Sequence, residues 1–297
     1  MIFFPGDDSC LSHHIFQTRE AALDAISSLA LGSLQISAQI VSTKCKEDVS
    51  DPSSTILLNS QFHTIVSDRD STPVQAILEL IKDKRPETRL LAASCMTTLC
   101  RNGIVTDQKA AMVQRVLPAL IKLLAEADPV REKAPEIMGR LVSESEEYQK
   151  AACDTDAIPT LAGFVKDPSP AISNKLRAAS LSALAAVSAT REESRKQVID
   201  AKILPHVVSA LGNPDATIRV AACFCLRSLS RSAKNLRTSL VDAGVAMPVF
   251  KLLSDVSPQV RSAACATLCN IVLEFSPMKK VTFFERICIL PFRKDSG

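Results

Sequence analysis

An arginine followed by an alanine-rich apolar run recurs six times along the chain of 297 residues. The arginines are Arg19, Arg89, Arg131, Arg177, Arg219 and Arg261. The last five follow one another at intervals of 42, 46, 42 and 42 residues, and the first interval, 70 residues, is one repeat plus an insertion. A fixed period in this range is the signature of a solenoid, in which each helical unit packs against its neighbours. The sequence therefore predicts stacked helical repeats.

Apolar residues keep a fixed register after each arginine. The seventh residue after it is Ile26, Met96, Met138, Leu184, Leu226 or Leu268, and the tenth is Leu29, Leu99, Leu141, Val187, Leu229 or Ile271. A spacing of three residues keeps side chains on one face of a helix, which is the face that packs against its neighbours. This register predicts a long helix in every repeat, with Leu226 and Leu268 among its buried residues.

Prolines mark two other points in each repeat. One set precedes apolar segments at 74–81, 119–124, 160–165, 206–211 and 249–253, and its members are Pro73, Pro118, Pro159, Pro205 and Pro248. Proline suits the first turn of a helix, because its missing N–H would be unpaired there. The other set lies in polar turns before the arginine-led helix: Pro86, Pro129, Pro168, Pro214 and Pro258. Each repeat is therefore expected to hold a short helix, a proline-started second helix and a long third helix.

The composition favours helices and argues against nucleic acid and membranes as partners. The chain has eight glycines and no tryptophan, and no apolar run approaches the ~18–20 residues of a membrane span. The formal charge is +3, and residues 277–297 supply all of the excess with five basic and two acidic side chains. The neutral remainder offers no basic stripe for phosphates. We therefore expect neither nucleic acid nor a membrane as partner.

Ten cysteines without a paired framework indicate a reducing compartment, which is the cytoplasm or the nucleus. Six of them lie in apolar helical runs and are expected to be buried: Cys95, Cys100, Cys223, Cys225, Cys265 and Cys269. Cys265 and Cys269 are four residues apart, as two metal ligands can be. Because no histidine pair or second cysteine pair has ligand spacing, packing in the core is the favoured interpretation, and no metal site is predicted.

No segment has the pattern of a catalytic or cofactor site. The chain lacks a glycine-rich phosphate loop, and neither Ser239 nor His206 stands in a motif for nucleophilic catalysis. We therefore expect a protein that is not an enzyme, with no catalytic residue, no cofactor and no small-molecule substrate.

The third helices supply the candidates for protein binding. The repeated arginines are expected to be structural, with their stems along the solenoid and their heads on acids or carbonyls. The ninth residue after the arginine recurs on one face of successive third helices, the expected concave wall. The candidates there are Ser28, Thr98, Arg140, Ser228 and Asn270. An asparagine amide both donates and accepts, as a peptide backbone requires, but one such residue in six repeats does not predict a regular asparagine ladder.

The helix junctions resemble those of armadillo repeats. Residues 242–253, DAGVAMPVFKLL, match the junction between the first two armadillo helices, and residues 157–161, AIPTL, are a shorter match. The resemblance implies an all-α, armadillo-type α-solenoid, a right-handed superhelix of stacked three-helix repeats. We expect an atypical N-terminal segment at 1–14, about five to six repeats at 15–278 with a polar insertion around 42–55, and an atypical C-terminal tail at 279–297.

A narrower resemblance is to the armadillo repeat-containing protein 8 family. It is carried by residues 218–239, by LCNIVLEFSP at 268–277 and by AASCMTTLCRNG at 92–103. The family is an armadillo subunit of the GID/CTLH E3 ubiquitin ligase. The resemblance implies a non-catalytic scaffold that links the substrate receptor to the RING-containing core in ubiquitin-dependent protein degradation, in cytoplasm and nucleus. Family members continue with further repeats after the phrase at 268–277, so the chain is expected to be a truncated member.

A general armadillo adaptor remains the alternative interpretation. Such a protein would bind an extended peptide in the groove of its solenoid, as importins and catenins do. A pull-down with this chain as bait would distinguish the two interpretations. Recovery of ligase subunits would favour the ligase scaffold, and recovery of nuclear-transport or cadherin-type peptides would favour the general adaptor.

Overall fold

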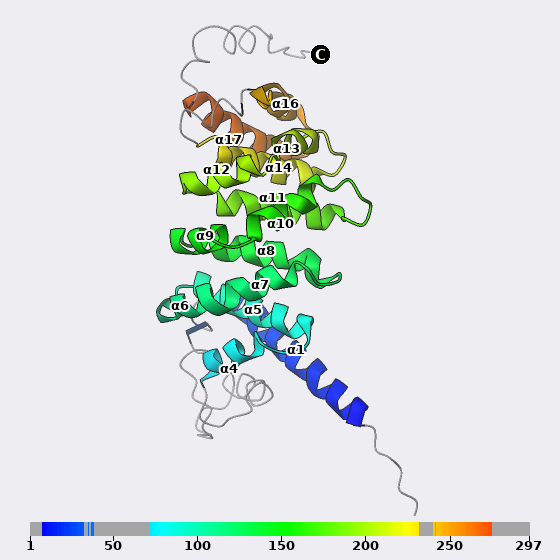
Figure 1. The fold of residues 1–297 in the computed structure, drawn as a ribbon, viewed down its shortest axis with the longest axis vertical. Coiled ribbons are helices and arrows are strands. Elements are labelled where there is room, and N and C mark those ends of the chain that lie inside the picture. Colours follow the sequence, from blue (N-terminus) through cyan, green and yellow to red (C-terminus); the bar gives the residue numbers. More distant parts are fainter. Residues whose placement is uncertain are drawn as a thin grey trace, which may run out of the picture. The chain divides into compact units, whose positions relative to one another are not determined.

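The computed structural model describes residues 8–32, 35, 37–38, 72–231, 240 and 242–274 (Figure 1). Within these residues the regular structure is helical and includes no strand. The predicted insertion at 42–55 and the predicted tail at 279–297 lie outside the described residues. The chain divides into two compact units, Met1–Asp154 and Thr155–Gly297, and each is taken in turn.

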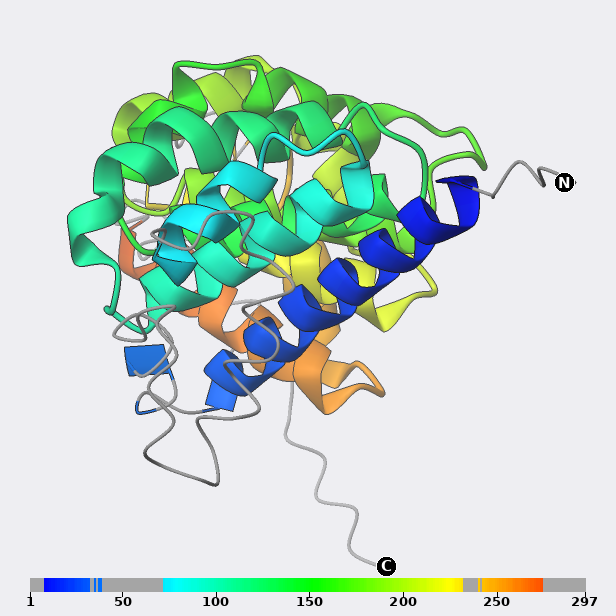
Figure 2. The same ribbon diagram turned by 90° about the horizontal axis from the view of Figure 1, so that it is seen from below.

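The first unit holds three arginine-led helices with their partners. These arginine-led helices are α1 (Asp8–Gly32), α5 (Pro86–Arg101) and α8 (Val130–Val142). The shorter helices include α4 (Pro73–Leu80), α7 (Leu117–Leu123) and α9 (Glu146–Cys153). α5 packs against both α1 and α8, and α4 and α7 pack against α5 and α8 as second helices. Figure 2 shows α1, in dark blue, lying beside α5.

One repeat of the first unit joins its first and second helices end to end. Here η1 (Thr106–Gln108) is followed without a break by α6 (Lys109–Ala111), η2 (Met112–Val116) and α7. η2 is a π-helical turn, and the N–H of Leu117 donates to the carbonyl of Met112. Pro118 has no N–H for the usual α-helical bond, and the widened turn directly precedes it. The predicted separate start of the second helix is therefore wrong for this repeat.

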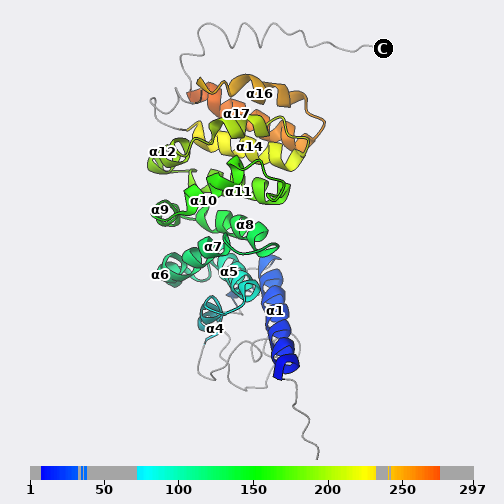
Figure 3. The same cartoon turned by 45° about the vertical axis from the view of Figure 1, so that its right-hand side comes forward.

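The second unit holds the arginine-led helices α11 (Asn174–Val187), α14 (Ala216–Leu229) and α17 (Pro258–Glu274). The shorter elements are α10 (Ala157–Lys166), α12 (Glu192–Asp200), α13 (Leu204–Ala210), α16 (Ala246–Lys251) and η3 (Leu252–Ser254). α14 packs between α11 and α17 (Figure 3). α10, α13 and α16 pack against α11, α14 and α17 respectively. The predicted order of a second helix and a long third helix is confirmed here, with the proline at the start of α13 but two residues inside α10 and α16.

The predicted register of the third helices is confirmed. Every seventh-position side chain is buried, from Ile26 to Leu268. The tenth position is buried from Leu99 to Ile271, and the side chain of Leu29 lies outside the described part. Alanine pairs such as Ala221 and Ala222 are buried as well. Short side chains at these positions let neighbouring helix axes approach closely, so the alanine-rich run is a packing surface.

The helix starts near Arg19 and Pro135 differ from those of the other repeats. Arg19 lies well inside α1, which begins at Asp8, whereas the other repeated arginines lie in the first turns of their helices. Pro135 lies inside α8, which begins at Val130, so the proline does not delay the helix start. The lost N–H of Pro135 leaves the carbonyl four residues earlier without its usual helical donor.

Replacement of Leu226 by alanine tests the register. Leu226 is 1% exposed, so Leu226→Ala is expected to lower the free energy of unfolding by ~2–5 kcal/mol through lost transfer energy and a residual cavity. Val256→Ala is the control, because Val256 is 92% exposed and surface changes usually stay within ~0.5 kcal/mol. Urea denaturation followed by circular dichroism at the helix band measures both. Equal effects of the two substitutions would contradict the register.

Candidate protein-binding surface on the third helices

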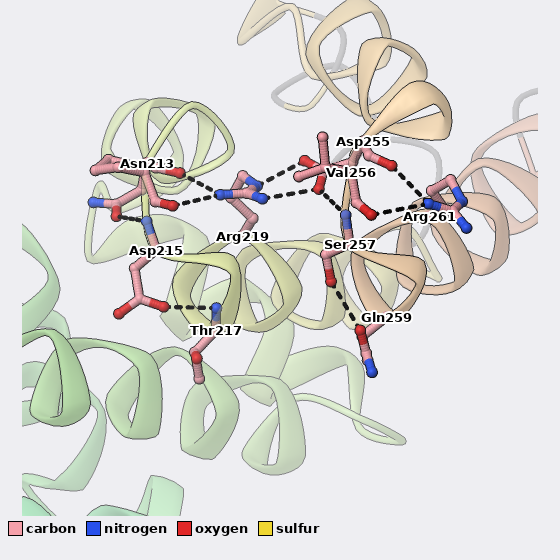
Figure 4. A network of polar contacts seen from close by, with 10 residues as sticks. Asn213, Asp215, Thr217, Arg219, Asp255, Val256, Ser257, Gln259 and Arg261 are labelled. Carbon is pink, nitrogen blue, oxygen red and sulfur yellow. Dashed lines mark hydrogen bonds and ion pairs between the residues drawn. The ribbon is translucent and has the colours of Figure 1, made fainter.

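The repeated arginine fixes the turns between successive repeats. In α14 the Nε and Nη2 atoms of Arg219 donate to the two carboxylate oxygens of Asp255, each at 2.8 Å (Figure 4). Nη1 of Arg219 donates to the carbonyls of Asn213 and Pro214 at 2.8 and 2.9 Å. The Arg219 and Asp255 side chains are 10% and 9% exposed. This bidentate, charge-assisted contact joins the turn before α14 to the turn before α17.

Other repeats use the same contact in part. Arg89 also donates to the carbonyls five and six residues before it and pairs with Glu126 in the next turn. Arg261 donates to the two carbonyls at the same spacing. Arg131 instead pairs with Asp128 of its own turn. The prediction that the repeated arginines bind acids and carbonyls within the fold is therefore confirmed for these residues.

The carboxylates of these turns are held in the charged form. The Arg219 guanidinium, followed by the N–H of Ser257, keeps the pKa of Asp255 below its usual value. The N–H of Thr217 does the same for the pKa of Asp215, which also accepts from Asn174. Hydrogen bonds to a carboxylate favour its ionised form. Both turns therefore depend on charged carboxylates.

In the second unit the ninth-position candidates join one third helix to the preceding one. Ser228 Oγ donates to the carbonyl of Ala185 in α11 at 2.8 Å, and Asn270 Nδ2 donates to the carbonyl of Arg227 in α14 at 3.3 Å. Both residues are half-buried. These contacts are structural, and a role of the two residues in protein binding stays a prediction.

In the first unit the ninth-position candidates have different surroundings. Ser28 is exposed on α1. Thr98 is buried, and its Oγ1 donates to the carbonyl of Ser94 in the same helix at 2.9 Å. Arg140 is half-buried, and its Nε has no hydrogen-bond partner. Ser28 thus has an exposed hydroxyl group on this unit, the unpaired Nε of Arg140 is buried, and Thr98 has its hydroxyl engaged.

Two open hollows lie between the third helices of the second unit. The larger, of about 530 Å³, is lined by Val220, Phe224, Arg227, Pro258, Gln259, Ser262, Ala263 and Ala266. The smaller, of about 290 Å³, is lined by Ser182, Ala185, Ala186, Ala189, Phe224, Arg227, Ser228 and Arg231. Phe224 and Arg227 belong to both linings, so they form the ridge between the hollows. Ser228 is the one predicted candidate found in either lining.

The ridge on α14 is aromatic and basic. Phe224 is 42% exposed, Arg227 follows it at helical spacing on α14, and Arg231, in the turn after the helix, lines the smaller hollow beside them. Within the described residues neither arginine has an ion-pair partner; Nη1 of Arg231 lies 3.5 Å from the carbonyl of Ala189, and Nε of Arg227 has no hydrogen-bond partner. The sequences of α11 and α14 contain no aspartate or glutamate. The surface therefore offers positive charge beside an apolar side chain.

The sequence does contain a signal for this ridge, but at the fifth residue after the repeated arginine and not at the ninth, where the binding candidates were sought. The fifth residue after the repeated arginine is polar or small in the other repeats: Asp24, Ser94, Glu136, Ser182 and Ala266. These side chains are exposed or half-buried in the structure. Phe224 occupies the same position in α14. An aromatic residue at a position that is exposed or half-buried in the other repeats is therefore the sequence signal for this surface.

Of the six cysteines expected in the core, three are buried, Cys100 is half-buried, and two are exposed. Cys95, Cys223 and Cys225 lie inside the packed helices, and burial raises the pKa of each thiol to about 12. Such thiols stay protonated near neutral pH and behave as small hydrophobic groups.

The prediction of core packing is wrong for Cys265 and Cys269, which are both exposed on α17. Cys265 holds the register position that Cys223 holds in α14. α17 covers Cys223, and Thr267 Oγ1 donates to the Cys223 carbonyl at 2.9 Å. No third helix of the described part covers α17 in the same way, so the same residue type at the same position is exposed.

The described residues contain no cluster of three or more histidine, cysteine or acidic side chains placed to hold a metal ion. The same residues contain no helix with both the length and the apolar character that a bilayer span requires.

Comparison with known sequences finds related proteins of greater length. The chain is 33% identical over 228 residues to GID complex subunit 5 of Schizosaccharomyces pombe, a match covering 68% of this chain and 29% of the relative. It is 28% identical over 234 residues to armadillo repeat-containing protein 8 of Pongo abelii, covering 73% of this chain and 35% of the relative. The chain thus spans about a third of the length of these curated relatives. Residues 175–264 match the family described as the Vacuolar 14 Fab1-binding region.

Comparison with solved structures confirms the armadillo-type α-solenoid. One similar structure is of computationally designed armadillo repeat proteins for modular peptide recognition, with a TM-score of 0.61, 17% identity, and coverage of 86% of this chain and 98% of that one. Another is a designed armadillo repeat protein in complex with the peptide (KR)4, with a TM-score of 0.60, 16% identity, and coverage of 87% and 98%. These likenesses establish the fold.

Removal of the Asp255 charge is expected to destabilise the chain at neutral pH. The pKa of Asp255 is lower in the folded chain than in the unfolded one, so its contribution is present above the ordinary aspartate pKa of about 3.9 and is lost as the pH falls through the folded value. Asp255→Asn should therefore lower the melting temperature at pH 7, and the difference from the parent chain should narrow below about pH 4.

The control is Glu193→Gln, because Glu193 pairs with Arg191 at 3.5 Å with its side chain 72% exposed, and exposed pairs contribute little. Thermal melts of the three proteins across this pH range provide the measurement. A difference between Asp255→Asn and the parent chain that stayed constant down to pH 3 would show that the carboxylate charge is not what stabilises the turn.

Thiol labelling should separate the exposed cysteines from the buried ones. With a pKa of about 12, the Cys223 thiol has a thiolate fraction of only about 10⁻⁴ at pH 8, and packing excludes the reagent as well. We expect N-ethylmaleimide to modify Cys265 and Cys269 in the native chain, and Cys95, Cys223 and Cys225 only after denaturation. Mass spectrometry of the peptides measures this. Labelling of native Cys223 at the rate of Cys265 would contradict the packing of α17 on α14.

Proposed function

We propose that the chain, which belongs to the same family as armadillo repeat-containing protein 8 and GID complex subunit 5, is a non-catalytic adaptor subunit of a GID/CTLH-type E3 ubiquitin ligase. The observation that carries this proposal is the sequence relation, which extends over about 70% of the chain. In this role the chain links the substrate receptor to the RING-containing core, in the cytoplasm and the nucleus.

The surface chemistry supports an adaptor. The second unit presents two hollows, an exposed aromatic side chain and two arginines without ion-pair partners among the described residues, arranged on packed helices. Exposed apolar groups rimmed by polar ones are typical of protein interaction sites. The packed third helices of this unit hold such groups at fixed spacing, so they can present them to a partner in a defined orientation.

The match to the Vacuolar 14 Fab1-binding region bears on where a partner binds. Its name describes partner binding by that protein, and the matched residues 175–264 include α11, α14 and the first part of α17. We take this stretch as the partner-binding stretch of the present chain also.

A general peptide-binding armadillo adaptor is the second candidate. The two hollows favour this candidate, because an extended peptide segment could bind in them whether or not the chain belongs to a ligase. The two candidates differ in the partner, and the same pull-down experiment distinguishes them.

Co-expression with ligase subunits tests the proposed function. The tagged chain is expressed together with the RING-containing and substrate-receptor subunits of a GID/CTLH ligase, and the purified material is analysed by mass spectrometry. We expect both kinds of subunit to be recovered with the chain, and no ubiquitin transfer by the chain alone. The Leu226→Ala variant serves as the comparison bait. Because this substitution disturbs the packing of α14, it should reduce the amount of ligase subunits recovered with the chain.

Two results would contradict the proposal. One is a folded bait that recovers neither kind of ligase subunit. The other is recovery of nuclear-transport or cadherin-type peptides in their place, which would favour the second candidate.

A further inference from the structure

We propose that the two hollows beside Phe224 bind an extended acidic segment of a partner protein, with a carboxylate against Arg227 and Arg231 and an apolar side chain in the larger hollow. The inference rests on the proposed adaptor function and deepens it by naming the kind of segment that is bound.

The exposed aromatic ring supplies the first argument. Phe224 is 42% exposed, although its chain neighbours Cys223 and Cys225 are buried. An exposed phenyl ring between two hollows keeps apolar area in water, and a partner that covers the ring removes that area. The larger hollow continues this apolar surface with Val220, Ala263 and Ala266. It therefore suits an aromatic or aliphatic side chain.

The floors of the hollows supply the second argument. On the α11 side the floor is made of small residues, among them Ser182, Ala186 and Ala189. On the α17 side Ser262 and Ala266 take the same place. Short side chains on both sides of a ridge leave room for a partner's backbone to lie across α14. A narrow chain in an extended conformation fits this shape, because its side chains alternate between the two sides.

The charge of the ridge supplies the third argument. Arg227 on α14 and Arg231 in the turn after it line the same hollow, and the helices α11 and α14 contain no acidic residue to neutralise them. The buried Nε of Arg227 has no hydrogen-bond partner in the fold, unlike the guanidinium of Arg219, which has four contacts with acceptors. Two neighbouring guanidinium groups repel each other, and a carboxylate between them supplies acceptors to both. The ridge is therefore complementary to an acidic side chain.

The geometry sets the spacing of the bound segment. Arg231 lines the smaller hollow, Arg227 lies on the ridge between the two hollows, and the apolar residues Val220, Ala263 and Ala266 line the larger hollow on the other side of α14. Packed helix axes lie about 8–10 Å apart, and an extended chain rises about 3.3 Å per residue. The acidic and apolar side chains of the segment should therefore be about two to four residues apart.

Selection from a phage-displayed library of random nonapeptides tests the inference, because the library contains acidic and non-acidic segments alike and favours no particular partner. The full chain and its Arg227→Glu/Arg231→Glu variant are used as baits. We expect the parent chain to enrich aspartate or glutamate two to four residues from a phenylalanine, leucine or isoleucine. The double variant should lose this enrichment of acids, and Phe224→Ala should lose the enrichment of the apolar residue.

The affinity of one selected peptide gives the size of the effect. By fluorescence anisotropy the double variant should bind it at least about tenfold more weakly than the parent chain, as expected for the loss of a charge-assisted contact. Lys122→Glu/Lys133→Glu is the matched control, because it changes the net charge equally at exposed positions of the first unit and should change the affinity by less than about twofold. Circular dichroism shows that each variant is folded, and Arg227→Gln is the alternative if the double variant is not.

Three outcomes would overturn the inference. The first is a parent chain that enriches no acidic residue over the starting library, and the second is an enrichment that persists in the double variant. The third is a short single-stranded RNA that displaces the selected peptide and binds more tightly, which would show that the ridge is a phosphate site. Loss of ligase subunits in the pull-down with intact peptide selection would contradict the proposed ligase role alone, so the two failures are distinguishable.

Discussion

Within each unit, the packing of one third helix on the next is the constraint on which the rest of the structure depends. Buried alanines such as Ala221 and Ala263 let α14 and α17 approach, and side-chain donors then reach the backbone carbonyls of the preceding helix. Ser228 and Thr267 both make this contact, so the spacing of the helices is fixed by hydrogen bonds as well as by apolar area. Where the outward-facing residues of helices at this spacing are small, hollows remain between the helices. A partner protein can bind in these hollows.

Arginines on one helix have two different roles, which their contacts separate. All three guanidinium nitrogens of Arg219 donate hydrogen bonds, two to the Asp255 carboxylate and one to two carbonyls of the preceding turn. The charge of Arg219 is therefore fully engaged in joining two repeats. Arg227, two turns later, has no carboxylate partner among the described residues and lines both hollows. The first arginine stabilises the scaffold, and the second gives the scaffold a surface charge that a partner can bind. A count of charges along the chain would not distinguish them.

The sequence predicts the buried faces well because one rule, three-residue spacing on a helix, decides them. Leu226 and Leu268 are buried for this reason. The rule fails where burial depends on what lies beyond the helix: Cys265 has the register of Cys223, yet no described helix covers it. The sequence identifies the candidate surface in part, since Ser228 lines a hollow. A comparison of the fifth position across repeats would add Phe224, but the shape of the hollows depends on side chains from two helices at once.

Photo-crosslinking from the ridge in an assembled complex tests the central claim most directly. A photoreactive phenylalanine analogue replaces Phe224, which lines both hollows, or Val256, which is 92% exposed in a turn of the same unit. The chain is then irradiated together with the ligase subunits. The account predicts crosslinks from position 224 to an acidic segment of a ligase subunit and few from position 256. Equal crosslinking from both positions, or none from position 224 in an intact complex, would contradict it.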